Sequence, residues 1–198
     1  MDKTAQPFVR AEIERSRATL AALLADEALL AAIARAAALC IDALRRGNKL
    51  MLAGNGGSAA DAQHLAAELV GRLNVERAGL PALALTTDSS VLTAVGNDYG
   101  FAELFRRQVE ALGQSGDVLL TISTSGRSRN IVAAVAAARA KGIATIGLTG
   151  AGGGELAAAC DLCLRVPAGD TQKIQEAHIV IGHIVCGLVE RALFPAAP

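Results

Sequence analysis

The first quarter of the chain has the apolar pattern of helices. Residues from about Pro7 to Arg46 are rich in Ala and Leu, with charged residues on a minority face. Asp26 is expected to end one helix and cap the next, and Gly47 to stop the second helix. This N-terminal helical segment, 1–47, either covers the sheet of its own domain or forms a helix pair that also packs against other subunits.

Beyond residue 47, short apolar runs alternate with helical segments. The apolar runs predict strands at about 49–53, 81–86, 118–123, 143–149 and 162–166. The other segments predict helices at about 59–73, 89–95, 101–112, 128–141 and 172–193, with a short helix after 154. Strands that alternate with helices pair in parallel, so we expect an α/β layered fold. No linker or repeat is visible, so residues 1–198 are expected to form one domain with an α/β core at 48–198.

Composition narrows the range of functions. Hydrophobic residues make up 52% of the 198-residue chain, charged residues 19% and aromatic residues 3%. The 19 basic and 19 acidic residues balance, which disfavours nucleic-acid binding, and the scarcity of aromatic rings disfavours base stacking. No signal peptide is visible, and the apolar stretch 28–44 is interrupted by charges and short for a bilayer, so no membrane contact is expected.

The four cysteines are scattered, which fits a reducing compartment, and we expect a cytoplasmic protein. Cys160 and Cys163 have C-x-x-C spacing, but no second pair accompanies them. Near a strand edge their side chains are expected to point to opposite faces. A zinc ribbon is therefore disfavoured.

Two loops that follow predicted strands carry unusual residues, at the edge where open parallel sheets bind ligands. The first, Gly54–Ser58 (Gly-Asn-Gly-Gly-Ser), lets a ligand approach bare backbone. Gly54, Gly56 and Ala59 match a dinucleotide-binding fingerprint. The acidic residue expected about 20 positions later is missing, however, since Asp88 lies 34 positions after Gly54. Nicotinamide binding is therefore disfavoured.

The second loop, 123–128 (Ser-Thr-Ser-Gly-Arg-Ser), places four hydroxyl groups between a strand and the start of a helix. Backbone amides and the positive end of the helix dipole attract anions there, and hydroxyls add directional donors. Simple N-capping by Ser125 or Ser128 accounts for one hydroxyl, not four. A Walker loop is excluded because no Lys-Ser/Thr pair follows a glycine-rich stretch. We expect this loop to bind phosphate.

Metal-binding chemistry is indicated on the helix after the first loop. Asp61, His64 and Glu68 are three and four residues apart and fall on one face. His and Glu at i and i+4 can share one divalent ion. Two alternatives remain open: Ser58 and Asp61 form a capping box, or the His-Glu pair is a hydrogen-bonded surface pair.

The last predicted helix is apolar almost all round beyond Glu176, so it is expected to be largely buried. Its polar residues Gln175, His178 and His183 must then be hydrogen-bonded or act as ligands. The spacing alone does not choose between His178 and His183 as a second imidazole ligand.

Taken together, these residues resemble the sugar isomerase (SIS) domain family, and within it the isomerases of phosphorylated heptoses. The resemblance covers nearly the whole chain and is carried by five ordered segments, 54–58, 61–72, 96–98, 122–126 and 171–183. It implies a doubly wound parallel sheet flanked by helices, with the N-terminal helices used in oligomer packing. It also implies a homotetramer with active sites between subunits.

The resemblance further implies roles for individual residues. The sugar phosphate would be held by Ser123, Thr124, Ser125 and Ser128. The rest of the substrate would be contacted by Asn55, Gly56, Gly57, Ser58, Glu68, Asn97, Asp98 and Gln175. One Zn²⁺ per subunit would be bound by His64, Glu68, Gln175 and His183, which selects His183 over His178 by resemblance alone. Arg127 stands where the family's loop is expected to have Asn, which puts little in doubt because amides and hydroxyls bind the phosphate.

The implied reaction converts D-sedoheptulose 7-phosphate into D-glycero-D-manno-heptose 7-phosphate, an early step toward nucleotide-activated heptose for lipopolysaccharide or capsule. A proton moves between adjacent carbons, which needs a base, an acid and stabilisation of an enediolate. Glu68 is the expected base and His183 the expected acid, with Asp61 as an alternative participant. Zinc would polarise the carbonyl.

Three rival hypotheses remain. The same scaffold resembles proteins that bind a replication initiator without catalysis, but those are expected to lack the paired Glu68 and His183. A sugar-phosphate sensor of a regulator would need a DNA-binding domain, for which 198 residues leave no room. An isomerase or deaminase of another sugar phosphate stays open.

Overall fold

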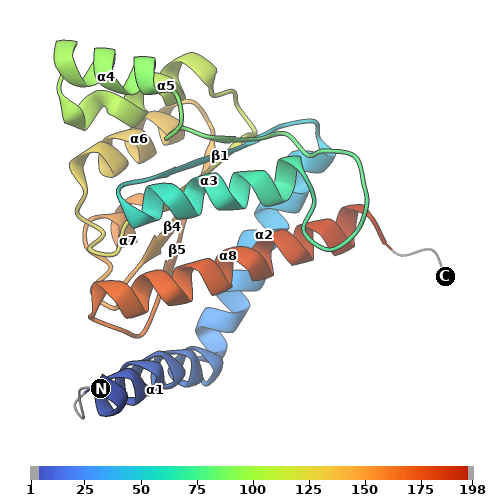
Figure 1. Cartoon of the computed structure of the whole chain (residues 1–198). Helices are drawn as coiled ribbons and strands as arrows, with labels where there is room; N and C mark the ends of the chain where they lie inside the picture. Colours follow the sequence, from blue (N-terminus) through green and yellow to red (C-terminus); the bar gives the residue numbers. More distant parts are fainter. Residues whose placement is uncertain (1–4, 196–198) are drawn as a thin grey trace.

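A five-stranded parallel sheet organises the molecule. The computed structural model describes residues 5–195 (Figure 1). Within this range the strands are β1 (Leu50–Gly54), β2 (Ala82–Ala84), β3 (Val118–Ile122), β4 (Ala144–Thr149) and β5 (Leu162–Arg165). They lie in the order β2-β1-β3-β4-β5. Gly54 pairs with Ile122, so β1 and β3 end side by side at the point where the strand order reverses.

Helices cover both faces of the sheet, which confirms the doubly wound α/β fold. One face is covered by α2 (Glu27–Arg45), α3 (Gly57–Val70) and α8 (Thr171–Leu193). The other carries α5 (Leu104–Leu112), α6 (Arg129–Ala140) and α7 (Leu156–Ala159). Strand alternation explains the two layers: Leu50 and Leu52 face the first set of helices, and Met51 and Ala53 face the second.

The N-terminal helices begin and end as predicted. The carboxylate of Asp26 accepts a hydrogen bond from Leu29 N at 3.0 Å and caps α2, and Gly47 follows that helix with a φ of 80°. Helix α1 (Ala5–Leu24) lies outside the sheet layers, beside α8 (Figure 1). Within it Leu23 is the one buried side chain. Five large apolar side chains of α1 are exposed: Phe8, Val9, Ile13, Leu20 and Leu24.

Several predicted boundaries were wrong. Helix α3 starts at Gly57 and not at residue 59, because the chain already turns at Gly56 (φ 55°), and it ends at Val70. Ser58 is therefore a buried residue inside the helix, and the capping box with Asp61 does not form. The second strand has three residues and not six. The helix predicted at 89–95 continues to 98 as α4 (Ser89–Asp98), and the segment 101–112 opens with a 3₁₀ turn, η1 (Phe101–Glu103).

The prediction that the side chains of Cys160 and Cys163 point to opposite faces was also wrong. A methyl group on Gly147 of β4 would lie 3.0 Å from the sulfur of Cys160 and 3.6 Å from that of Cys163. Both sulfurs thus sit over the same glycine, because Cys160 precedes the strand and does not follow its alternation. Burial raises the pKa of Cys160 to about 12 and also raises that of Cys163. Neither thiol is disposed to ionise and bind zinc.

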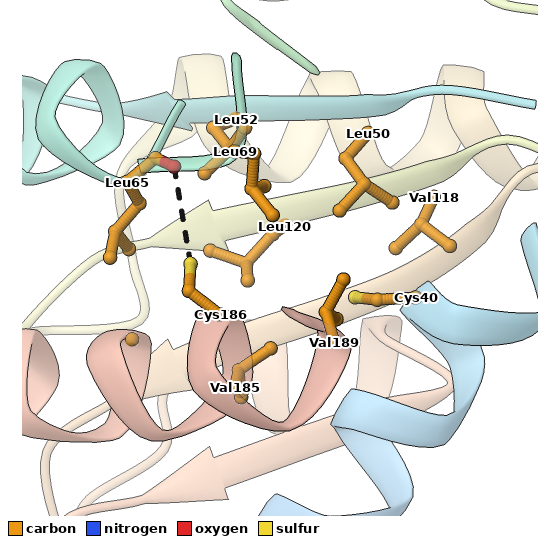
Figure 2. Close-up of a pocket in the computed structure, with 11 residues that line it drawn as sticks. Cys40, Leu50, Leu52, Leu65, Leu69, Val118, Leu120, Val185, Cys186 and Val189 are labelled. Carbon is orange, nitrogen blue, oxygen red and sulfur yellow. Dashed lines mark hydrogen bonds between the residues drawn. The ribbon is translucent and has the colours of Figure 1, made fainter. Parts of the chain in front are cut away.

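The layer beneath α3 and α8 is tightly packed. A cavity of about 10 Å³ lies between these helices, α2 and the sheet, which is at the lower limit for one water molecule. Figure 2 shows its lining, with the sulfur of Cys186 pointing toward the carbonyl oxygen of Leu65 at 3.9 Å. No helix within residues 5–195 combines the length and apolar character that crossing a bilayer requires.

Candidate active site

Helices α3 and α8 run side by side in the same direction. Three contacts along the pair have nearly constant sequence separation: Gly57 with Gln175, Leu65 with Gly182, and Leu73, just after α3, with Glu190. A methyl group on Gly182 would lie 2.6 Å from Leu65 Cδ1 and Cδ2, so the glycine allows the helices to approach closely. Matched turns of the two helices therefore face each other.

Three metal-ligating side chains converge on this helix pair. His64 Nε2 lies 2.8 Å from His183 Nε2 and 3.3 Å from Glu68 Oε1. Ligand atoms of all three residues lie within 4.8 Å of one another. The side chain of His64 is 48% exposed and that of Glu68 is 19% exposed, so the cluster opens to the surface. The sequence predicted these three residues as ligands, and the structure brings them together.

The donor set fits a divalent cation. Ligand atoms around a tetrahedral ion with bonds of about 2.1 Å lie roughly 3.4 Å apart, close to the separations in this cluster. Two imidazoles and one carboxylate are also the donor set found at many catalytic zinc sites. The His64–Glu68–His183 cluster is therefore a metal-compatible site.

Asp61 lies one turn before His64 and is half-buried. Its Oδ2 is buried without a hydrogen-bond partner within residues 5–195. Burial raises the pKa of Asp61, while His64 and His183 oppose that rise. A carboxyl with a raised pKa beside two imidazoles is a typical feature of functional sites.

The remaining polar residues of α8 lie elsewhere. A methyl group on Gly57 would lie 2.6 Å from Gln175 Nε2, so Gln175 sits over the start of α3, two turns before His183. His178 is fully buried, and its Nε2 donates a hydrogen bond to Thr149 O at 3.1 Å. Burial lowers the pKa of His178 to about 4, against the smaller opposing effect of this hydrogen bond. The structure thus separates the two imidazoles that spacing could not distinguish.

The glycine-rich loop is joined to the start of α6. Asn130 Nδ2 donates to Asn55 Oδ1 at 2.8 Å, and Asn55 Nδ2 donates to Asn130 Oδ1 at 3.0 Å. Asn130 is 1% exposed, so this reciprocal pair is a rigid connection between the two strand-end loops. Asn130 is not among the residues predicted for the site. The signal was a polar residue on the apolar face of a helix, where it needs a partner.

The hydroxyl-rich loop has an internal network. Ser123 Oγ and Ser128 Oγ lie 3.0 Å apart, and Arg127 N donates to Ser125 Oγ at 3.2 Å. Ser128 precedes α6 as its N-cap residue, but its side chain makes no capping hydrogen bond. The hydroxyl of Ser128 is thus paired with that of Ser123 beside the start of α6, a place where helix N-terminal amides suit an anion.

A pocket of about 290 Å³ adjoins the first loop, lined by Asn55, Gly56, Thr86 and residues of α4, η1 and α5. Asn97 and Asp98 do not line it. They are exposed at the end of α4, where Asn97 Nδ2 donates to Asp98 Oδ1 at 2.8 Å. Asp88 caps α4 by accepting from Val91 N at 3.0 Å, so its carboxylate is engaged as a cap.

Comparison with known proteins places these features in a family. Residues 13–150 match the SIS domain family. The chain is 55% identical over 194 residues to the phosphoheptose isomerase of Burkholderia pseudomallei (strain 1710b), covering 98% of both sequences. It is 54% identical to that of Aneurinibacillus thermoaerophilus, covering 94% of both.

The chain belongs to the phosphoheptose isomerase family of SIS-domain proteins. A solved phosphoheptose isomerase from Neisseria gonorrhoeae superposes with a TM-score of 0.88 at 44% identity, covering 94% of this chain and 98% of that one. The resemblance inferred from the sequence is thereby confirmed. Members of this family are sugar-phosphate isomerases, which favours catalysis over a partner-binding or sensor role.

Proposed function

We propose that the protein converts D-sedoheptulose 7-phosphate into D-glycero-D-manno-heptose 7-phosphate in the cytoplasm, as an early step toward nucleotide-activated heptose for lipopolysaccharide or capsule. The observation that carries this proposal is the convergence of His64, Glu68 and His183 in a chain of the phosphoheptose isomerase family.

In this proposal the strand-end loops hold the substrate. The hydroxyls of Ser123, Thr124, Ser125 and Ser128 and the first amides of α6 bind the phosphate. Asn55, Gly56 and Gly57 contact the sugar beside the pocket at the end of β1, whereas Ser58 is buried inside α3 and does not line this pocket. The Asn55–Asn130 pair supports the assignment, because it fixes the first loop relative to the phosphate loop.

The cofactor in this proposal is Zn²⁺, one per subunit, held by His64, Glu68 and His183. The resemblance adds Gln175 as a fourth donor, although in this chain its amide lies over the start of α3, two turns before His183. The ion would polarise the substrate carbonyl and stabilise negative charge on its oxygen. Gln175 also contacts the substrate.

Protein side chains carry the proton. Glu68 Oε removes the proton from the carbon next to the carbonyl, and His183 donates a proton at the carbonyl oxygen, which gives the enediol. The hydroxyl on the first carbon then loses its proton to His183 while Glu68 returns a proton to the former carbonyl carbon, which completes the exchange of ketone for aldehyde. A carboxylate bound to a metal is a weaker base, so Asp61, whose raised pKa suits proton transfer, shares this role.

The assembly in this proposal is a homotetramer with active sites between subunits. The exposed apolar side chains of α1 support it, since a second copy would bury them. Asn97 and Asp98 face solvent away from the pocket, which is consistent with contact to substrate in a neighbouring subunit. Light scattering during size-exclusion chromatography should give four times the 20.2 kDa chain mass.

A turnover assay tests the activity. Zinc-loaded and chelator-treated protein are incubated with sedoheptulose 7-phosphate, and aldose formation is followed. We expect turnover that the chelator removes and added zinc restores. Absence of turnover in both states would refute the proposed activity and favour a partner-binding role.

A second assay tests Glu68. The Glu68→Gln variant is incubated with substrate in deuterated water, and deuterium at the reacting carbons is measured by NMR. We expect exchange slowed by a factor of about 10²–10⁴. Exchange at the parent rate would exclude Glu68 as the base and leave Asp61.

A further inference from the structure

A buried ion pair joins α8 to the chain that leaves α3. Arg77 lies in the connection between α3 and β2, and its Nε lies 3.1 Å from Glu190 Oε1 on α8. The two side chains are 1% and 3% exposed. Glu190 also accepts hydrogen bonds from Leu73 N at 3.1 Å and Asn74 N at 2.8 Å. Glu190 thereby holds the segment after α3 against α8.

The other side of the Arg77 guanidinium binds the last turn of α3. Nη2 donates to the carbonyl oxygen of Glu68 at 2.7 Å, and Nη1 donates to that of Leu69 at 2.8 Å. Nη1 also reaches Gly71 O at 3.1 Å and Ala78 O at 2.9 Å. Carbonyls at a helix end lack partners within the helix, and Arg77 supplies one to Glu68 O, while Leu69 O accepts from both Arg77 and Leu80 N. The planar guanidinium of Arg77 therefore connects the carboxylate of Glu190 to the backbone carbonyl of Glu68.

This connection lies close to the metal-compatible cluster. Glu68 belongs to the cluster and is held at its backbone, and Glu190 lies seven residues, about two turns, beyond His183. The ion pair thus links the end of α3 to α8, the two helices that carry His64, Glu68 and His183.

Burying a charge pair between two helices carries a large desolvation free energy. Apolar side chains of similar volume often give equal or greater stability, because the ions lose their hydration. What an apolar pair does not supply is direction, whereas a guanidinium presents five donors in a fixed plane. The chemistry of this pair therefore indicates a requirement for geometry.

We propose that Arg77, supported by Glu190, is a positioning residue that sets the end of α3 against α8 so that Glu68 meets His64 and His183 around a divalent cation. This inference rests on the metal site of the proposed function. Arg77 itself touches neither substrate nor cation.

The test compares two variants that each neutralise one ion pair with a buried carboxylate. Arg77→Met/Glu190→Gln removes this pair and keeps one of the two acceptor oxygens that the amides of residues 73 and 74 use. Lys49→Met/Asp117→Asn removes the pair with 2.6 Å between Lys49 Nζ and Asp117 Oδ2, which lies just before β1 and β3 and involves neither α3 nor α8. Zinc affinity of the metal-free full chain is measured by competition with a chromogenic chelator. The absorption spectrum of bound Co²⁺ and the melting temperature are recorded beside it.

We expect the Arg77→Met/Glu190→Gln variant to raise the zinc Kd about tenfold or more and to change the Co²⁺ spectrum. The Lys49→Met/Asp117→Asn variant should lower the melting temperature but leave Kd within about twofold. A parent-like Kd and Co²⁺ spectrum in the first variant, or an equal rise of Kd in both, would overturn the inference.

Arg77→Lys covers the case in which the first variant does not fold. Lysine keeps the positive charge but lacks the planar set of donors of arginine, so the zinc Kd of this variant should also rise. An unchanged zinc Kd would count against the inference. Parent protein that binds zinc but does not turn over sedoheptulose 7-phosphate would refute the proposed activity alone, since the Kd comparison still decides the role of Arg77. Parent protein that binds no divalent cation would refute both.

Discussion

His64 and His183 are 119 residues apart in the chain, yet their Nε2 atoms lie 2.8 Å apart. The ring centroids are 5.1 Å apart and the planes meet at 68°, so the two rings meet edge to face. Two N–H groups cannot face each other at this distance, so the nitrogens share one proton or one cation. The whole proposed chemistry depends on this contact.

Removing either imidazole should abolish metal-dependent turnover. We expect His64→Ala and His183→Ala each to lower kcat/KM by a factor of about 10²–10⁴, because a ligand and, for His183, a proton donor are lost. Isothermal titration with zinc should show weakened binding in both. Gln172→Ala, an exposed position on α8, is the control and should behave as the parent. Parent-like zinc affinity in both histidine variants would contradict the assignment.

The hydroxyl-rich loop should determine affinity for the phosphate. Replacing Ser123 or Ser125 with Ala removes one hydrogen-bonding group, worth about 1 kcal/mol, so KM should rise about fivefold while kcat changes less. Steady-state kinetics with sedoheptulose 7-phosphate measures the split. Ser115→Ala, an exposed serine at the amino end of β3, serves as the control. A fall in kcat at unchanged KM would argue against phosphate binding by this loop.

His178 should make stability depend on pH. Its pKa falls from 6.5 to about 4 on folding because the ring is buried, so the unfolded chain takes up the proton first. The contribution of neutral His178 to the free energy of unfolding is complete above pH 6.5. It is lost as the pH falls toward 4, and its total is about 3 kcal/mol. Urea titrations at several pH values measure it. His178→Gln keeps a donor for Thr149 O and does not titrate, so the free energy of unfolding of this variant should depend less on pH between 4 and 6.5. An equally steep dependence in the variant would assign the effect to other groups.

Two glycines of α8 should respond oppositely to alanine. At Gly182 the new methyl meets Leu65 at 2.6 Å, so the buried Leu65 side chain or the helix must shift, which should cost about 1–3 kcal/mol of stability and weaken zinc binding. At Gly187 the nearest atom, Leu73 Cδ2, is 3.7 Å away, so the helix gains up to about 1 kcal/mol. Thermal unfolding and zinc titration of Gly182→Ala and Gly187→Ala test this. Equal effects at both positions would show that close approach of α3 and α8 is not required.

The sequence predicted the layers and the chemistry of each element better than the contacts between elements. Alternating strands and helices gave the parallel sheet, and the spacing of His64 and Glu68 placed them on one helical face. Helix spacing does not report how two helices face each other, so it left His178 and His183 equivalent. That choice depends on packing, in which Gly182 lets α8 approach Leu65 closely and leaves His183 beside His64.

Other features of the site could not be predicted from the sequence, because each depends on a partner residue that is remote in the chain. Asn130 is a polar residue on the apolar face of a predicted helix, which indicates a partner, but only the fold shows that the partner is Asn55. Arg77 stood in a polar loop with nothing to mark it, and its role appears once Glu190 lies beside it. The predicted substrate contacts Asn97 and Asp98 remain a prediction, because they lie outside the pocket formed by one chain.

The parallel pairing of α3 with α8 has a consequence for biosynthesis. The segment that contains residue 64 leaves the ribosome long before the segment that contains residue 183, and domains acquire structure from the N-terminus as synthesis proceeds. The sheet strands precede α8 in the chain, whereas the His64–Glu68–His183 cluster is completed by this last helix. A nascent or prematurely terminated polypeptide without α8 lacks the second imidazole, so under the proposed mechanism isomerase activity can begin only after α8 has been translated.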